Sequence, residues 1–194
     1  DGTFTVTQGK VEGKALSSVD LNGSSEYISA SDAAGLSFGD GSDDSPFSVS
    51  AWIRADANNF PIISKGHYNS DVGEYALTIN SSGHLAFELY DESNLSSAFW
   101  IGRLDNTYAD GEIRDVRIYD YELSADQASS LYSGSYNVTP KYWWKIDEGH
   151  TTEGTVDASG AFEDSGTGTD ADGTGTNLDA DSCVNGTLDL DGTL

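Results

Sequence analysis

The strongest constraint on this chain is that apolar residues return at every second position in run after run. Such runs occur at 2–7, 47–54, 75–79, 85–89 and 112–119. Alternation with period two is typical of strands that bury one face. The turn-forming sequence Asn80-Ser81-Ser82-Gly83 joins two of these runs, which predicts a β-hairpin over 75–89.

One stretch favours a helix instead. Ser124 and Gln127 have the spacing of a capping box, in which each side chain bonds the backbone N–H of the other residue. We expect a helix of about two turns that ends at Tyr132, with Gly134 as its left-handed exit. Many short strands and one short helix predict an all-β fold, an antiparallel two-sheet jelly-roll sandwich.

The composition changes after Lys145. Residues 146–194 contain 12 Asp or Glu and no Lys or Arg. The chain therefore divides into a sandwich domain, 1–140, and an acidic carboxyl-terminal arm, 141–194. A solvated tail is one interpretation of such a charge run. Strand-forming residues at both ends of the arm favour two strands joined by a long acidic loop; they are Tyr142, Trp143, Trp144, Ile146, Leu188 and Leu190.

The charge balance limits the partners that the chain can have. The 194 residues include 33 acidic and 9 basic side chains, for a formal net charge of −24. Nucleic acids and anionic membranes are bound largely through Lys and Arg, which argues against both as main partners. No run of about 18 apolar residues occurs, so we expect no membrane insertion. Such Asp-rich acidity is typical of proteins exposed to salt water, and we expect an extracellular, cell-surface or virion location.

Four blocks of the sequence follow one another in a recognisable order. They are residues 13–28, 45–53, 60–77 and 110–125, and they include the strings GKAL, SPFSVSAWI and GEIRDVRIY. These blocks resemble the successive strands of laminin-G-like domains, which have a concanavalin A-like jelly roll. The resemblance covers residues 13–132 and implies the same fold, with adhesion or carbohydrate binding as the common role.

Two departures from this family bear on assembly. The family places a further hairpin between the strands that match 85–90 and 101–103, where this chain has only about ten residues. That hairpin is either deleted or untraced, and a deletion would expose sheet edges. The family's opening segment also stands at the wrong end of this chain, in 142–149, 156–160 and 185–188. The carboxyl end therefore resembles the start of a second copy of the domain.

The sequence lacks the catalytic pattern of related glycan-cleaving enzymes. Those enzymes place paired carboxylates on one face of a strand, on either side of a glycosidic bond. Here Glu112 and Asp115 are three positions apart and point to opposite faces of a regular strand. The three histidines, His67, His84 and His150, show no metal-ligand spacing. We expect a protein that is not an enzyme.

Two acidic loops are candidate calcium sites, because calcium prefers hard oxygen ligands. Asp40, Asp43 and Asp44 crowd a Gly-rich turn just before Phe47. Asp170, Asp172 and Asp179 follow in part the spacing of a helix-flanked calcium loop, which would require Asp at 168 and Glu at 179. A plain solvated acidic turn is the alternative for each loop.

Exposed aromatic side chains beside polar groups would be needed for sugar binding. Tyr68 and Trp100 occur in loop-like stretches and are the candidate sugar-contacting residues. Trp52 lies opposite the Phe47 face and is either core or platform. Packing is the alternative role for all three.

Two functions compete at this point. The first is a structural subunit that self-assembles head to tail into a filament, surface layer or virion appendage by donating its carboxyl-terminal strands, 142–146 and 186–190, to the next copy. If the arm folds back instead, the domain closes on itself and can stay monomeric. The alternative function is a calcium-dependent carbohydrate-binding or adhesion module of a larger surface protein.

Overall fold

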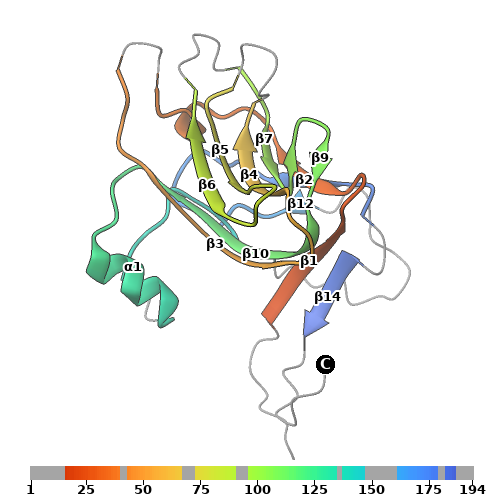
Figure 1. Cartoon of the computed structure of the whole chain (residues 1–194). Coiled ribbons are helices and arrows are strands. Elements are labelled where there is room, and N and C mark those ends of the chain that lie inside the picture. Colours follow the sequence, from red (N-terminus) through yellow and green to blue (C-terminus); the bar gives the residue numbers. More distant parts are fainter. Residues whose placement is uncertain are drawn as a thin grey trace, which may run out of the picture.

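The computed structural model describes residues 16–39, 43–66, 73–90, 96–134, 137–146, 161–178 and 182–186. Its strands form two antiparallel sheets and a small ribbon (Figure 1). Sheet A contains β3 (Ser48–Ala55), β10 (Asp110–Tyr119), β1 (Leu16–Asn22), β11 (Tyr142–Trp144) and β14 (Cys183–Gly186). Sheet B contains, in order, β12 (Ala161–Phe162), β13 (Gly173–Thr176), β2 (Tyr27–Ala30), β7 (Phe99–Ile101), β4 (Phe60–Lys65), β5 (Tyr75–Ile79) and β6 (Leu85–Leu89). The ribbon pairs β8 (Arg103–Leu104) with β9 (Thr107–Tyr108).

The predicted fold class, an all-β antiparallel two-sheet sandwich with one short helix, is confirmed. Besides a 3-10 turn, η1 (Ala34–Leu36), the described residues contain one α-helix, α1 (Ala125–Tyr132). The capping box is present, because the Gln127 N–H donates to Ser124 Oγ at 3.3 Å and the Ser124 N–H donates to Gln127 Oε1 at 2.9 Å. The predicted hairpin is also confirmed: β5 pairs with β6, with Leu77 opposite Phe87.

The long strand β10 organises sheet A. It pairs with β3 along one edge, while β1 and then β11 share its other edge. The changeover falls at Asp115, which has a positive φ of 54° and lies where the register with β3 shifts. A bulge of this kind bends the strand and increases its twist. The bend lets one strand take two successive neighbours on the same side.

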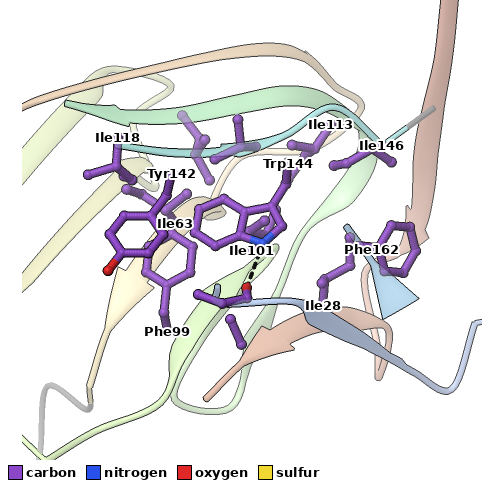
Figure 2. Packing of buried hydrophobic residues seen from close by; sticks show 14 of the residues in the cluster. Ile28, Ile63, Phe99, Ile101, Ile113, Ile118, Tyr142, Trp144, Ile146 and Phe162 are labelled. Carbon is purple, nitrogen blue, oxygen red and sulfur yellow. Dashed lines mark hydrogen bonds between the residues drawn. The ribbon is translucent and has the colours of Figure 1, made fainter. Parts of the chain in front are cut away.

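The core lies between the inward faces of the two sheets (Figure 2). Ile113 and Ile118 point inward from β10, and Ile63 and Ile101 face them from sheet B. Ile113 and Ile118 are five positions apart, so strict alternation would place them on opposite faces of β10. The bulge at Asp115 interrupts the alternation, and both side chains join one shared apolar layer.

A charged side chain is also buried at one end of the core. Lys65 has no exposed side-chain surface, and its Nζ lies 2.7 Å from Asp32 Oδ1 and 3.4 Å from Glu74 Oε1. The ammonium also donates to the Ser97 carbonyl at 2.6 Å. A buried charge is tolerated only with such partners.

Candidate functional sites

The carboxyl-terminal segment provides the centre of the packed core. Trp144 on β11 is fully buried and stacks on Phe99 of the opposite sheet, with ring centroids 4.9 Å apart. Its Nε1–H donates to the Ala171 carbonyl at 3.0 Å, the bond drawn in Figure 2. Tyr142 stacks on Trp144 from the same strand, and Ile146 is buried beside them. Three of the predicted assembly residues therefore lie inside this chain's own sandwich.

The rest of this segment extends both sheets. β13 pairs with β2 and β12 pairs with β13, which together form one edge of sheet B. β14 pairs with β1 at the edge of sheet A, with Leu16 opposite Gly186. The described part of the 141–194 arm thus folds back and pairs with strands of its own chain. Two predicted assembly residues, Leu188 and Leu190, lie outside the described residues.

Trp143, the remaining predicted assembly residue, points to the outside of sheet A. Two cations lie close to its indole ring, the Arg117 guanidinium at 4.4 Å and the Lys145 ammonium at 4.7 Å from the ring centroid. Its Nε1–H donates to the carboxylate of Asp115, which also receives two hydrogen bonds from Arg117. Cation–π contacts and a charge-assisted hydrogen bond therefore fasten β11 to β10 from the outer side.

A second candidate site is a pocket on the outer face of sheet A. It has a volume of about 200 Å³ and is lined by Ser18, Trp52, Ile53, Arg54, Glu112 and Arg114. Trp52 and Arg54 are two positions apart on β3, and Glu112 and Arg114 are two positions apart on β10. Each pair therefore lies on one face of its strand. In the β3–β10 register Arg114 lies opposite Trp52, and Glu112 lies opposite Arg54. We call this site the Trp52 pocket.

The indole of Trp52 is the hydrophobic surface of this pocket. Its side chain is 38% exposed, and its ring packs on Tyr132 from the last turn of α1 at a centroid distance of 5.8 Å. The Arg114 guanidinium lies 5.5 Å from the Trp52 ring centroid. Within the described part of the chain, no carboxylate pairs with Arg114. The pocket therefore offers an aromatic surface next to an unneutralised cation.

The other polar groups of the pocket neutralise one another. Arg54 pairs with Glu112 at 2.9 Å and with Asp56 at 3.3 Å. Glu112 also accepts a hydrogen bond from Ser18 Oγ at 2.9 Å. Nearby on β1, burial and then the charge of Glu112 raise the pKa of the Asp20 carboxyl. The charges of Arg54 and Glu112 thus neutralise each other, and the guanidinium of Arg114 remains available to bind a ligand.

The predicted calcium loops are only partly described. Asp43 and Asp44 are exposed, and Asp44 forms an isolated β-bridge with Gly39, while Asp40 lies outside the described residues. In the second loop Asp172 accepts the Asp164 N–H at 2.9 Å, and its hydrogen bond and charge raise the pKa of Asp170. Asp179 lies outside the described residues. Over the ranges that the structure covers, no group of three or more acidic, His or Cys side chains is arranged to hold a metal ion.

The predicted sugar contacts differ from the pocket that the fold creates. Trp100 is only 7% exposed, with the Arg103 guanidinium 4.4 Å from its ring centroid. Its ring is therefore occupied in packing, and Tyr68 lies outside the described residues. Trp52, for which the sequence left open a core position or a sugar-binding surface, has the exposed indole. The prediction missed Arg114 because its position beside Trp52 depends on strand register; alternation of Trp and Arg on two strands was the available signal.

No family model matches this chain, and no curated protein shows significant similarity to it. Among the described helices, none combines the length and apolar character needed to cross a membrane. Any function must therefore be argued from the sites themselves.

Proposed function

We propose that this chain is a non-enzymatic binding module whose Trp52 pocket holds a sugar bearing a carboxylate. The observation that carries the proposal is the pairing of an exposed indole face with the Arg114 guanidinium, which has no carboxylate partner among the described residues. Aromatic rings pack on the apolar faces of sugar rings, and guanidinium groups match carboxylates with two parallel hydrogen bonds. The resemblance to laminin-G-like domains is in keeping with this role.

The large negative charge of the chain does not prevent an anionic ligand from binding here. At physiological salt the Debye length is about 8 Å, so exposed charges farther away are largely screened. Two of the four arginines of the chain line this pocket. The local groups therefore decide which ligand binds, and the surrounding acidity slows its approach.

The test compares oligogalacturonate with its methyl ester, which has the same sugar rings without the charge. Tryptophan fluorescence and calorimetry should detect tighter binding of the acid form. Trp52→Ala should abolish binding of both sugars, whereas Arg114→Gln should weaken the acid at least about tenfold and leave the ester unchanged. Lys141→Gln removes an equal charge at an exposed ion pair elsewhere and serves as control.

Unchanged affinity in both pocket variants, with native circular dichroism, would refute the pocket proposal. The same titrations with a calcium chelator test the separate prediction of calcium dependence. Loss of affinity on chelation supports it, and equal affinity refutes it.

A second candidate function, a structural subunit that assembles by strand exchange, rests on the carboxyl-terminal segment. Strands β11, β13 and β14 pair with β10, β2 and β1, which lie outside the arm, so the same contacts can form within one chain or between two. We propose that a truncated chain ending at residue 140 is unstable and that added segment 141–194 restores its Tm. A truncated chain that keeps its full stability and still assembles would contradict this proposal.

A further inference from the structure

The strand β6 carries an apolar row that the sandwich leaves uncovered. Leu85, Phe87 and Leu89 are 69%, 50% and 63% exposed. They lie opposite Ile79, Leu77 and Tyr75 of β5, and Tyr75 is buried in the core. The row therefore belongs to the inward face of sheet B, where a sandwich buries its apolar residues.

Sheet A also leaves apolar residues partly uncovered, on its edge strand β3. The inward residues of β3, namely Val49, Ala51 and Ile53, are only partly buried. Phe47, which precedes β3, contacts Phe87 of β6, with ring centroids 5.7 Å apart. We call the partly or largely exposed apolar residues of the two strands the open groove; they are Val49, Ala51, Ile53, Leu85, Phe87 and Leu89.

Both strands that border the open groove also have an unpaired edge. Within the described residues, β3 pairs with β10 alone and β6 pairs with β5 alone. Natural edge strands are usually protected by Lys, Pro or a bulge that twists the edge away. Neither strand contains Lys or Pro, and each carries one charged residue, Arg54 on β3 and Glu88 on β6. An apolar groove with unpaired edges fits an extended strand that has apolar side chains on alternate positions.

Two segments of the chain outside the described residues have this alternating pattern. They are residues 2–7, GTFTVT, and residues 187–190, TLDL. The first segment is uncharged. The second contains Asp189, whose negative charge would be repelled by a strongly acidic protein. Residues 2–7 are therefore the better match.

The position of β1 favours donation to another copy. Residues 2–7 precede β1, which β10 separates from β3 in sheet A. In Figure 1 the start of β1 lies at the lower end of the molecule, away from β6.

We propose that residues 2–7 of one copy bind in the open groove of the next copy as an added β-strand. This contact joins two different surfaces, so it repeats head to tail and gives open chains unless the rotation closes a ring. It involves neither Trp52 nor Arg114 and does not require exchange of the carboxyl-terminal strands.

Light scattering on mixed variants tests this proposal. The wild-type mass should rise with concentration, whereas Phe4→Asp, which lacks a donor, and Phe87→Asp, which lacks an acceptor, should each stay monomeric. A one-to-one mixture of the two should give only dimers, a twofold mass, because one intact donor and one intact groove remain. Tyr132→Asp, at an 80% exposed aromatic elsewhere, should assemble like the wild type.

The alternatives give different patterns, each of which overturns the proposal. A groove-to-groove dimer would survive Phe4→Asp, and donation by residues 187–190 would be lost in Leu188→Asp but not in Phe4→Asp. A wild type that stays monomeric at all concentrations would also refute it. Circular dichroism must show native strand content in every variant, which half-exposed Phe87 and exposed Tyr132 allow.

Discussion

The two sides of this sandwich are completed in different ways. On the closed side, β11 lies beside β10 and places Trp144 against Phe99 of the opposite sheet, with no exposed surface on the indole. On the open side, the inward residues of β3 are only partly buried, and Phe87 of β6 is 50% exposed. The same alternating pattern specified both sides. Alternation therefore determines which residues face inward, but not whether another strand covers them.

The energetic consequence of this difference is large. Burial of a large apolar side chain contributes about 1.5–3 kcal/mol relative to leaving it exposed. Trp144 gains this in full and adds a hydrogen bond through its indole N–H. Phe87 gains about half of it, and Leu85 and Leu89 gain less than half. The closed side should therefore stabilise the monomer, and the open side should stabilise an assembly.

The largest expected effect is the loss of the indole on the closed side. Trp144→Ala should lower the free energy of unfolding by about 3–5 kcal/mol, because it leaves a cavity and an unpaired Ala171 carbonyl. Trp144→Phe keeps a stacked ring and should cost about half of that. Phe87→Ala on the open side should cost about 1 kcal/mol or less. Urea unfolding of the dilute proteins measures all three, and equal costs at Trp144 and Phe87 would contradict the comparison.

A smaller effect is expected from Glu74, which precedes the open-side strand β5. Burial raises the pKa of its carboxyl, even though Ser37 Oγ donates to Oε1 at 2.8 Å and Lys65 lies 3.4 Å away. Its Oε2 is buried without a hydrogen-bond partner, so no donor stabilises the ionised form at that oxygen. The folded state therefore binds this proton more tightly than the unfolded state does.

The sign of the pH dependence follows from that difference. The contribution of Glu74 is fully present below its ordinary pKa of 4.5 and is lost as the pH rises through the higher folded value. The difference in unfolding free energy between the wild type and the Glu74→Gln variant should therefore become smaller as the pH rises above 4.5. Glu88→Gln, which removes an exposed carboxyl, is the matched control. A difference that rises with pH would mean that the Lys65 ion pair, and not burial, dominates.

Local signals in the sequence were sufficient for the local structure. The capping residues Ser124 and Gln127 fixed the start of α1, and the turn at 80–83 fixed the β5–β6 hairpin. Both depend on residues close together in the chain. The all-β class followed from the same kind of information, because each strand carries its own alternation.

The pairing of distant segments could not be predicted in this way. Arg114 lies beside Trp52 because of a register that the bulge at Asp115 interrupts, and no local pattern specifies that register. The fold-back of 142–186 likewise depends on the fit of Trp144 against Phe99. The burial of Trp100 depends on Arg103, which the small β8–β9 ribbon holds over its ring.

Amide hydrogen exchange of the dilute monomer tests most directly whether the carboxyl-terminal segment closes one side and leaves the other open. Exchange of backbone amides reports local opening, which ranges from almost free at frayed edges to the global free energy in the core. The account predicts that residues 142–144 exchange among the slowest in the chain, with 116–118 of β10. Residues 85–89 should exchange at least about a hundredfold faster. Equal protection of 142–144 and 85–89, or fast exchange at 142–144, would contradict it.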